Sequence, residues 1–163
     1  MRIGVVSDTH NNLKNVGRIV ELFNEAGVDR VIHTGDITQA KTLDVLAGLT
    51  MPMVGVYGNN DVERQSLDEA VARHGFQFIE PPLKLAWHSH NIVVVHDPLE
   101  LSRVEPTEFQ IILHGHTHRQ TIEWEDGRLT FNPGECAGLM QGFNAIGVLD
   151  LNAPRLEPEI LNF

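Results

Sequence analysis

Residues 2–10 read Arg2-Ile3-Gly4-Val5-Val6-Ser7-Asp8-Thr9-His10, and the pattern in this stretch returns along the chain. A short, mostly apolar run typical of a buried strand passes directly into two polar side chains that can bind a metal ion. An extended backbone places side chains two residues apart on one face, so we expect Asp8 and His10 to point to the same place. The stretch therefore predicts a buried strand that ends in a pair of metal ligands.

Four further apolar runs are followed in the same way by polar side chains. These polar segments are Gly35-Asp36 after residues 31–34, Gly58-Asn59-Asn60-Asp61 after 53–57, His96 after 92–95, and Gly115-His116-Thr117-His118 after 111–114. In α/β proteins, ligands bind in the crevice outside the carboxyl ends of the strands. Five such strand ends predict one shared metal site. Its ligands are expected to be Asp8, His10, Asp36, Asn59, His96, His116 and His118.

The types of these side chains restrict the ion. Imidazole nitrogens, carboxylate oxygens and one amide oxygen suit Mn, Fe, Zn, Ni or Co, and the absence of a thiolate argues against a structural zinc site. We expect Gly35, Gly58 and Gly115 to let the chain turn sharply where a Cβ would crowd the ions. Gly-Asp and Asp-x-His are each common in loops, so the prediction depends on the combination of motifs.

The order of the predicted elements indicates an α/β fold. Residues 13–26 have an apolar period typical of a helix, closed by Gly27. Strands and helices alternate as far as His74, which favours parallel pairing. The pattern then changes to hairpins, one joining residues 83–88 to 92–96 across 89–91 and one joining 121–125 to 128–131 across 126–127. Residues 144–151 and 156–161 are expected to form the last strands, and the strand order stays open.

The combined motifs resemble the calcineurin-like metallophosphoesterases, and most of all their small bacterial and archaeal phosphodiesterase branch. The motifs that carry the resemblance are Asp8-x-His10, Gly35-Asp36, Gly58-Asn59, His96, Gly115-His116-Thr117-His118 and Asn132-Pro133-Gly134. They span about four fifths of the chain. The resemblance implies a four-layer α/β/β/α sandwich, with two mixed sheets flanked by helices, formed by a single domain over residues 1–163.

The resemblance also implies a dinuclear metal centre, with Mn²⁺ as the expected ion and Fe, Ni, Zn or Co as alternatives. The first ion would be held by Asp8, His10, Asp36 and His118, and the second by Asp36, Asn59, His96 and His116. Asp36 would then bridge the pair, and catalysis would rest on Asp36 and Asn59. Two ions roughly 3.5–4 Å apart can activate a metal-bridging hydroxide for in-line attack, which implies hydrolysis of small phosphodiesters.

Two positions depart from the family pattern. Many members carry a His after the metal-binding Asn, and it protonates the leaving group or steadies the transition state; here the residue is Asn60. An amide gives up no proton near neutral pH, so general-acid help of about 10²–10⁴-fold is expected to be missing and good leaving groups to be favoured. The small phosphodiesterase branch also lacks this His. Asn11 stands where many relatives have Gly, and we expect it to cap the next helix or to touch substrate, as Asn60 could.

Polar residues beside the motifs have plainer interpretations. His33 and His114 lie in apolar runs, where a place in the core or a hydrogen bond to a ligand is favoured over metal binding. Asp61 and Asp97 directly follow ligand positions, and we expect each to cap a helix or to accept hydrogen bonds.

Three further residues near the site are interpreted from their local sequence. Asn132 is predicted to form a turn, with orientation of a ligand as the alternative. Cys136 is predicted to be a small buried thiol rather than a catalytic nucleophile. For Arg119, contact with a substrate phosphate and a structural ion pair are both open.

Length and composition agree with one compact domain. The chain has 163 residues, of which 42% are hydrophobic and 21% charged, enough for a core of its own. No apolar run approaches the length of a membrane span, and the first residues lead into a strand rather than a signal peptide. A single cysteine excludes an intramolecular disulfide, which agrees with a reducing compartment. We therefore expect a cytoplasmic protein with no membrane partner.

Charge helps to separate substrate classes. The chain has 22 acidic and 12 basic residues and a formal net charge of −10. Such a protein has no broad basic surface with which to follow a nucleic acid backbone. Two divalent ions would supply enough local positive charge to recruit one phosphate group. A small phosphodiester is thus favoured over nucleic acid.

Two other functions have to be weighed. A phosphomonoesterase or nuclease of the same superfamily is disfavoured by Asn60 and by the acidic balance. A non-catalytic protein-binding scaffold is suggested by the retromer subunit with this fold, but that subunit has lost part of the metal set, whereas all seven positions are filled here. Fold alone does not assign function. The physiological substrate, the native metal and the oligomeric state stay open, a homo-oligomer included.

Overall fold

The computed structural model describes residues 1–140 and 142–163. In chain order, its elements are β1 (Arg2–Val6), α1 (Leu13–Ala26), β2 (Arg30–His33), α2 (Ala40–Leu46), β3 (Met53–Val56), α3 (Arg64–His74), β4 (Gln77–Ile79), β5 (Leu83–Trp87), β6 (His90–Val94), the 3-10 helices η1 (Pro98–Arg103) and η2 (Pro106–Glu108), β7 (Ile111–Leu113), β8 (Thr121–Glu125), β9 (Arg128–Asn132), β10 (Ala145–Asp150) and β11 (Glu159–Asn162).

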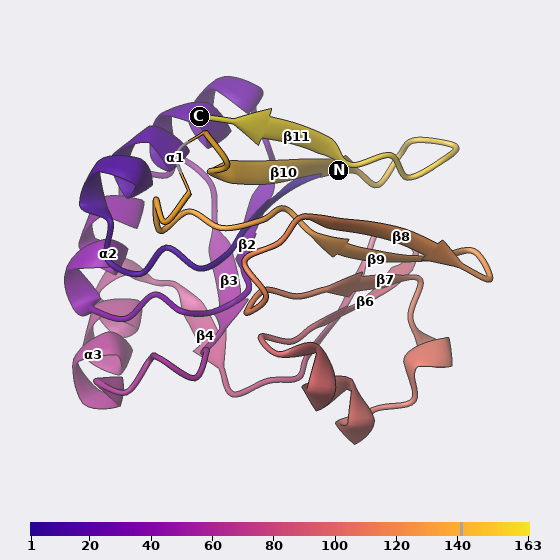
Figure 1. Ribbon diagram of the computed structural model, residues 1–163, viewed down its shortest axis with the longest axis horizontal. Coiled ribbons are helices and arrows are strands. Elements are labelled where there is room, and N and C mark those ends of the chain that lie inside the picture. Colours follow the sequence, from indigo (N-terminus) through magenta and orange to yellow (C-terminus); the bar gives the residue numbers. More distant parts are fainter. Residues whose placement is uncertain (141) are drawn as a thin grey trace.

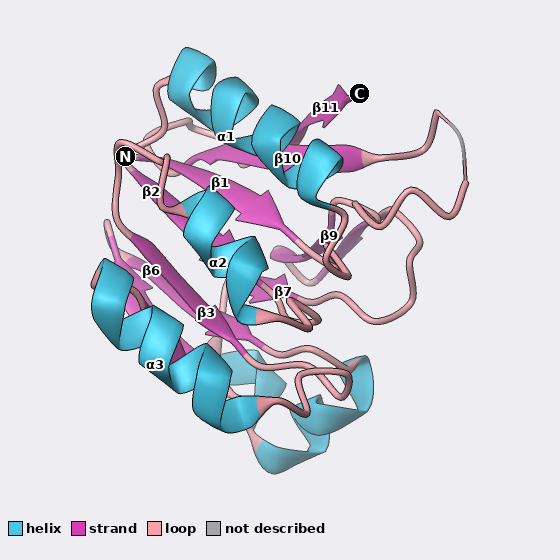
Figure 2. Ribbon diagram, turned by 90° about the vertical axis from the view of Figure 1, so that its left-hand side faces the viewer, coloured by secondary structure: helices cyan, strands magenta, loops and turns pink. Residues whose placement is uncertain are grey.

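The first sheet is mixed and has the strand order β11-β10-β1-β2-β3-β4. Strands β1 to β4 are parallel, as the alternation of strands and helices predicted, while β10 pairs antiparallel with both β1 and β11. The three α-helices cover one face of this sheet (Figures 1 and 2). Val16, Ile19 and Phe23 of α1 are fully buried in the core between helices and sheet.

The second sheet is also mixed and has the order β5-β6-β7-β9-β8. Its three central strands are parallel, and the edge strands β5 and β8 run antiparallel to their neighbours. Val93 and Ile112 on its outer face pack with Phe109 and with side chains of the η1–η2 segment. The predicted four-layer sandwich is therefore confirmed, and its second helical layer consists of two short 3-10 helices.

The two sheets bury a common core between them. Along β1, Ile3 and Val5 face the second sheet, whereas Val6 faces the helices. Ile92 and Ile111 meet the first sheet from the other side. This alternation is the two-residue period of a strand, and it explains why the strands of the site are apolar along their whole length.

The two predicted hairpins form, but one of their turns is tighter than expected. Asp126 and Gly127 have φ values of 50° and 80° and join β8 to β9, as predicted. In the other hairpin Trp87 pairs with His90, so the turn is not residues 89–91 but His88-Ser89, with φ values of 47° and 66°. Positive φ at both central residues matches the right-handed twist of the strands that a two-residue turn must join.

Two other strand predictions were incomplete. Strand β4, which pairs with β3 at the edge of the first sheet, was not anticipated, because three residues are too few to show a period. The last strand begins at Glu159 rather than at residue 156. Leu156 is buried in the core between the sheets, and Pro158 has no N–H to donate to a neighbouring strand.

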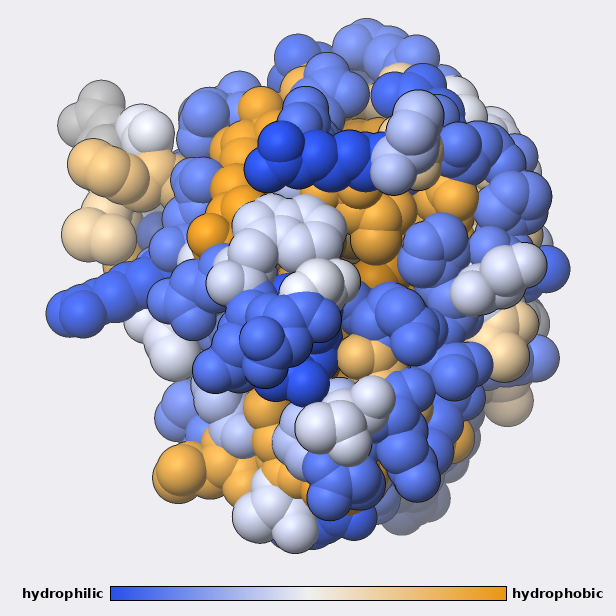
Figure 3. All heavy atoms as spheres, turned by 90° about the vertical axis from the view of Figure 1, so that its right-hand side faces the viewer, coloured by the Kyte–Doolittle hydropathy of each residue, from blue (hydrophilic) through white to orange (hydrophobic). Residues whose placement is uncertain are grey.

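Hydrophobic and hydrophilic side chains are mixed on the face opposite the α-helices (Figure 3). There, separate hydrophobic patches lie among hydrophilic side chains (Figure 3). Within the described residues, no helix has the length and hydrophobicity required to cross a membrane.

Candidate metal centre

The predicted ligands lie in the loops that follow β1, β2, β3, β6 and β7. Backbone hydrogen bonds join these loops within each sheet: the Asp8 N–H donates to Gly35 O (3.1 Å), and the Gly115 N–H donates to His96 O (3.0 Å). Side chains join them across the sheets, since the Asp8 carboxylate accepts from the His116 N–H at 3.0 Å. The five strand ends thus converge, as expected from the sequence.

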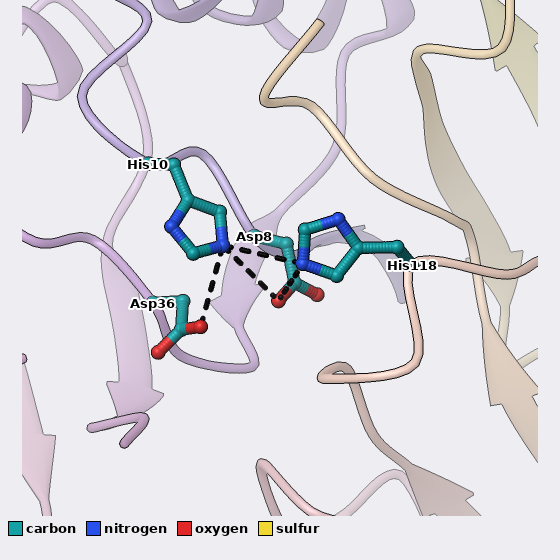
Figure 4. A group of neighbouring side chains, drawn as sticks. All are labelled: Asp8, His10, Asp36 and His118. Carbon is teal, nitrogen blue, oxygen red and sulfur yellow. Dashed lines mark hydrogen bonds and ion pairs between the residues drawn. The ribbon is translucent and has the colours of Figure 1, made fainter. Parts of the chain in front are cut away.

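A first group of donors consists of Asp8, His10, Asp36 and His118. One ligand atom from each of these lies within 4.8 Å of the others, and the four side chains point toward one another (Figure 4). His10 Nε2 is 3.2 Å from His118 Nε2 and 3.3 Å from Asp36 Oδ2. His118 Nε2 is in turn 3.3 Å from Asp8 Oδ1. This is the set that the resemblance assigns to the first ion.

A second group consists of Asn59, His96 and His116. Asn59 Oδ1 lies 3.0 Å from His96 Nε2 and 3.0 Å from His116 Nδ1, and these two nitrogens are 3.3 Å apart. His96 Nε2 is also 3.4 Å from Asp36 Oδ2. The same oxygen of Asp36 therefore lies beside imidazoles of both groups.

The backbone at these ligands differs from the extended conformation that the spacing suggested. Five of them have positive φ: Asp8 (51°), His10 (41°), Asp36 (61°), His116 (65°) and His118 (55°). Such left-handed conformations are rare outside glycine and collect at functional sites, where the surrounding structure holds them. The side chains of Asp8 and His10 do converge, but through turns rather than through an extended i, i+2 pair.

The three glycines of the motifs are required by close packing against other side chains and backbone, whereas the sequence predicted that a Cβ would crowd the ions. A Cβ at Gly35 would lie 2.6 Å from His96 Nδ1, one at Gly58 would lie 2.5 Å from the Asp36 backbone nitrogen, and one at Gly115 would lie 2.8 Å from Asp8 Oδ2. Real Cβ contacts are longer than this, so each glycine leaves space that a ligand residue occupies.

Asp61 accepts hydrogen bonds, as predicted, and all three come from backbone groups. Its Oδ2 accepts from Asp36 N (3.1 Å) and Gly58 N (2.7 Å), and its Oδ1 accepts from Thr38 N (2.6 Å). The side chain is buried, and burial raises the pKa of Asp61 above its ordinary value. Asp61 thereby joins the loop of Asp36 to the loop of Asn59.

His33 and His114 are buried and belong to neither donor group, as expected. His33 Nδ1 accepts from the Gly35 N–H at 3.1 Å, and its Nε2 lies 3.2 Å from Thr9 Oγ1. Burial lowers the pKa of His33 to about 4. His33 is therefore neutral near pH 7 and links the Gly35-Asp36 turn to the Asp8-Thr9-His10 turn.

The two residues proposed to touch substrate lie in different settings. Asn60 donates to Asp36 twice, from its backbone N–H to Oδ1 (2.9 Å) and from its side-chain Nδ2 to Oδ2 (2.8 Å). Asn11 does not cap α1, because Asn12 does so, accepting from Asn15 N at 3.3 Å. Asn11 Oδ1 is buried and has no hydrogen-bond partner among the described residues.

The neighbouring loops are braced by polar side chains. Asn132 forms its predicted turn, accepting from Gly134 N at 2.9 Å, and also donates to Gly115 O (3.3 Å) and Thr117 Oγ1 (3.2 Å). Asp97 caps η1, as expected.

Sequence reasoning missed two residues of this kind. Glu100 accepts from the His96 N–H at 3.0 Å, and Ser7 donates to Asp8 Oδ2. The Asp97-x-x-Glu100 spacing is a capping-box signature that could have pointed to Glu100. No comparable signal marks Ser7.

The electrostatics of the site favour cation binding. Burial raises the pKa of Asp36, but contacts with His96 and Asn60 outweigh it and hold this pKa far below its ordinary value. The pKa of Asp8 is also lowered. Burial by itself would raise this pKa, but the contacts with the His10 imidazole and the Ser7 hydroxyl outweigh burial. Burial lowers the pKa of His96, whereas Asp36 raises it, to about 9 in total. Both carboxylates are therefore ionised, and a metal would displace protons from imidazole.

One oxygen atom of the site, Asp8 Oδ1, is well placed to bind a cation. Asp8 Oδ1 is buried and accepts no hydrogen bond from any residue that the structure describes. A buried carboxylate oxygen that accepts no hydrogen bond is costly. The oxygen lies within the first donor group, so a metal ion held there would satisfy it. The residues present thus suit a divalent ion.

Cys136 and Arg119 are outside the donor groups. Cys136 is fully buried, its Sγ lies 3.3 Å from Ala145 O, and burial raises the pKa of the thiol. The prediction of a buried thiol is confirmed. Arg119 is exposed next to His118.

The chain is similar to known proteins over most of its length. Residues 1–153 match the calcineurin-like phosphoesterase superfamily domain. A phosphodiesterase of Methanocaldococcus jannaschii is 32% identical over 155 residues, covering 92% of this chain and 93% of its own. The phosphodiesterase YfcE of Escherichia coli is 25% identical over 167 residues, covering 92% and 88%. The solved structure of an archaeal phosphodiesterase superposes with a TM-score of 0.87 at 30% identity, covering 99% of this chain and 100% of that one.

The match extends over almost the whole chain and includes every motif from Asp8 to Asn132. The two relatives reported above, from Methanocaldococcus jannaschii and Escherichia coli, are both named phosphodiesterases. The chain is therefore a hydrolase of phosphoric esters that belongs to the calcineurin-like phosphoesterase superfamily.

Proposed function

We propose that this protein is a dinuclear, metal-dependent phosphodiesterase that hydrolyses small phosphodiesters. The observation that carries the proposal is the position of Asp36. One of its oxygens, Oδ2, lies 3.3 Å from His10 Nε2 and 3.4 Å from His96 Nε2. These imidazoles belong to two different donor groups, so a single carboxylate stands between them, as a bridging ligand must.

The donor groups would hold one divalent ion each, with Mn²⁺ as the expected ion and Fe, Ni, Zn or Co as alternatives. The first would be held by Asp8, His10, Asp36 and His118, and the second by Asp36, Asn59, His96 and His116. When bound, the ions would neutralise the phosphoryl oxygens and activate water for in-line attack.

The chain's own residues position the bridging carboxylate. Asn60 donates to both oxygens of Asp36, and Asp61 holds the Asp36 backbone N–H. Mutation of such partners of metal ligands typically costs about 10- to 100-fold in metal affinity or activity. Asn60 is thus assigned to orienting Asp36. Contact with substrate, proposed for Asn60 and Asn11 from the sequence, would be additional.

A phosphodiester with a good leaving group is the preferred substrate class. Asn60 has no proton to give, and its side-chain N–H already points to Asp36. A departing oxygen must therefore leave with little general-acid help. A monoesterase or nuclease of the same superfamily is the alternative, and the formal charge of −10 disfavours the nuclease.

The location is proposed to be the cytoplasm, which cell fractionation would test.

Hydrolysis of bis(para-nitrophenyl) phosphate and para-nitrophenyl phosphate by metal-stripped protein, with Mn²⁺ added back, tests the proposal. Both esters release the same alcohol, so their rate ratio reports diester preference. We expect cleavage only with metal and faster on the diester. If neither ester is hydrolysed although calorimetry shows that Mn²⁺ binds, the assignment would move to a binding scaffold.

Two substitutions sharpen this test. Asp36→Ala should abolish both hydrolysis and binding of the metal pair, while Asp44→Ala, an exposed carboxylate of α2, serves as the matched control and should retain both. Metal-dependent turnover in Asp36→Ala would contradict the assignment. Asn60→His should raise the rates on monoesters with poor leaving groups relative to those with good ones. Unchanged relative rates across a leaving-group series would contradict the proposal that general-acid help is missing because residue 60 is Asn.

A further inference from the structure

A cavity of about 290 Å³ adjoins the first donor group. Its lining includes His118, Arg119, Pro133, Met140 and Phe143, and we refer to it as the apolar cavity. His118 Nε2 lies 3.3 Å from Asp8 Oδ1, so the cavity and the first donor group share the His118 side chain.

One wall of the apolar cavity is formed by exposed hydrophobic side chains. Met140 is 47% exposed and Phe143 is 65% exposed. Hydrophobic side chains project from the molecule at the left edge of Figure 3. Large apolar groups left in solvent beside a polar site are typical of ligand-binding surfaces. Leu139, 72% exposed, belongs to the same segment but does not line the cavity.

A buried carboxylate holds this wall in place. Glu135 is 1% exposed, and its side chain accepts hydrogen bonds from the backbone N–H groups of Gly138 (3.0 Å), Leu139 (3.0 Å) and Met140 (3.2 Å). The Phe143 N–H donates to Met140 O at 3.2 Å. These three bonds fix the backbone of residues 138–140, and with it the position of Met140 in the wall.

A second cavity, of about 380 Å³, adjoins the other donor group and is lined by Asn59, His96 and His116. Its remaining walls include Asp97 and Arg103 and are largely polar. The metal centre thus lies between two cavities of different chemistry. A phosphodiester has two substituents with which to occupy them, whereas a monoester has one.

We propose that the apolar cavity binds an aromatic substituent of the substrate phosphodiester, with Phe143 and Met140 as specificity-determining residues. This inference rests on the proposed function and names the substrate class: a diester with at least one planar apolar arm. The volume suits a single ring system, the Phe143 ring can contact it edge-to-face, and the Met140 thioether packs well against aromatic edges. Arg119, which also lines the cavity, supplies a positive charge for the phosphate.

Calorimetric titration of the Mn²⁺-loaded protein with phenylphosphonate and methylphosphonate tests this proposal. Neither is hydrolysed, and they differ only in the arm beside the phosphorus. Wild-type protein should bind phenylphosphonate more tightly. Phe143→Ala should weaken phenylphosphonate binding by about 2- to 12-fold, the range for one aromatic contact, and should leave methylphosphonate unchanged. Met140→Ala should act in the same direction.

Two variants control the test. Leu139→Ala removes an equally exposed apolar side chain of the same segment and should change neither affinity. Phe143→Tyr keeps a ring and should retain the phenylphosphonate affinity that Phe143→Ala loses. Thermal melts verify that each variant is folded, which the exposure of these side chains favours.

The outcomes separate this inference from the proposed function. If Mn²⁺-dependent diester hydrolysis is present but Phe143→Ala and Met140→Ala bind phenylphosphonate as the wild type does, the aromatic subsite is wrong and the phosphodiesterase stands. The same holds if the wild type binds the two phosphonates equally. If Mn²⁺ elicits no hydrolysis and neither phosphonate binds, both proposals fail.

Discussion

Replacement of Gly58 by Ala should disrupt the metal centre through one added carbon. The new Cβ would lie 2.5 Å from the Asp36 backbone nitrogen and 2.9 Å from Asp36 Cγ. Since a Cβ needs 3.0–3.4 Å from other heavy atoms, the contact with the backbone nitrogen alone requires one of the two loops to move by roughly 0.5–0.9 Å, and the still closer contact with Asp36 Oδ1 requires more. Movement of either loop changes the position of Asp36, the carboxylate shared by the two donor groups, relative to Asn59.

The cost of this movement can be worked out from the contacts of Asp61. Its Oδ2 accepts hydrogen bonds from both loops, at 2.7 Å from Gly58 N and 3.1 Å from Asp36 N. Separation of the loops must stretch or break one of these bonds, and a hydrogen bond to a charged group contributes about 1.5–3 kcal/mol. With residual strain included, we expect the free energy of unfolding to fall by about 2–4 kcal/mol.

Urea unfolding of the metal-free protein, followed by circular dichroism, measures the loss of stability. Calorimetry with Mn²⁺ measures the effect on the site, which should be a weakening of about 10- to 100-fold. Gly17→Ala is the matched control. Nothing lies within 4 Å of a Cβ at Gly17, and in the interior of α1 the same substitution should stabilise the protein by about 0.5–1 kcal/mol.

Two results would refute this reasoning. A Gly58→Ala protein that unfolds at the urea concentration of the wild type would mean that the loops accommodate the carbon without strain. Wild-type affinity for Mn²⁺ in a destabilised Gly58→Ala protein would mean that the Asp61 contacts stabilise the fold without placing Asp36.

Three further predictions concern protonation, the bridging ligand and the thiol. Metal-free protein should be most stable near pH 6.5. Burial lowers the pKa of His33 to about 4, so the stability that depends on neutral His33 is lost as pH falls from 6.5. Burial also lowers the pKa of His96, but Asp36 outweighs it and raises this pKa to about 9, so the stability that depends on protonated His96 is lost as pH rises from 6.5. Denaturant titrations across this range check it, and a steady trend in one direction would contradict it. Asn60→Ala removes the side-chain bond to Asp36 Oδ2 and should weaken Mn²⁺ binding by about tenfold in calorimetry; equal affinity would argue against its positioning role. Cys136, fully buried, should react with a thiol reagent only after unfolding, and fast labelling of native protein would show the opposite.

Much of the fold could be predicted because its signals are local. The strand that leads to Asp8 is marked by a short apolar run, helix α1 by its apolar period and by Gly27, and the β8–β9 turn by Asp126-Gly127. Prediction failed where pairing depends on a distant partner. Strand β4 is three residues long and forms against β3, and β11 begins only after Pro158, where it can pair with β10.

The site shows the same division. Its residue types and their places after the strands are visible in the sequence, because carboxylates, amides and imidazoles at strand ends are a pattern within a few residues. Asp61 was expected to cap a helix or to accept hydrogen bonds, and His33 to lie in the core or to form a hydrogen bond to a ligand. The partners of these two side chains could not be identified from the sequence. Glu135, which orders the wall of the apolar cavity through Gly138, Leu139 and Met140, left no signal, because a buried acid and a surface acid look alike in a sequence.

Local patterns of side chains were thus sufficient for most element types, for the parallel pairing near the amino terminus and for the choice of seven candidate ligands, whose metal binding stays a prediction. The strand order, the left-handed backbone at Asp8 and Asp36, and the sharing of one Asp36 oxygen by both donor groups needed the folded chain. Each of these depends on groups far apart in sequence, such as the His116 N–H and the Asp8 carboxylate, separated by 108 residues and only 3.0 Å apart in space. Their geometry is set by packing of the two sheets against each other, which no local pattern encodes.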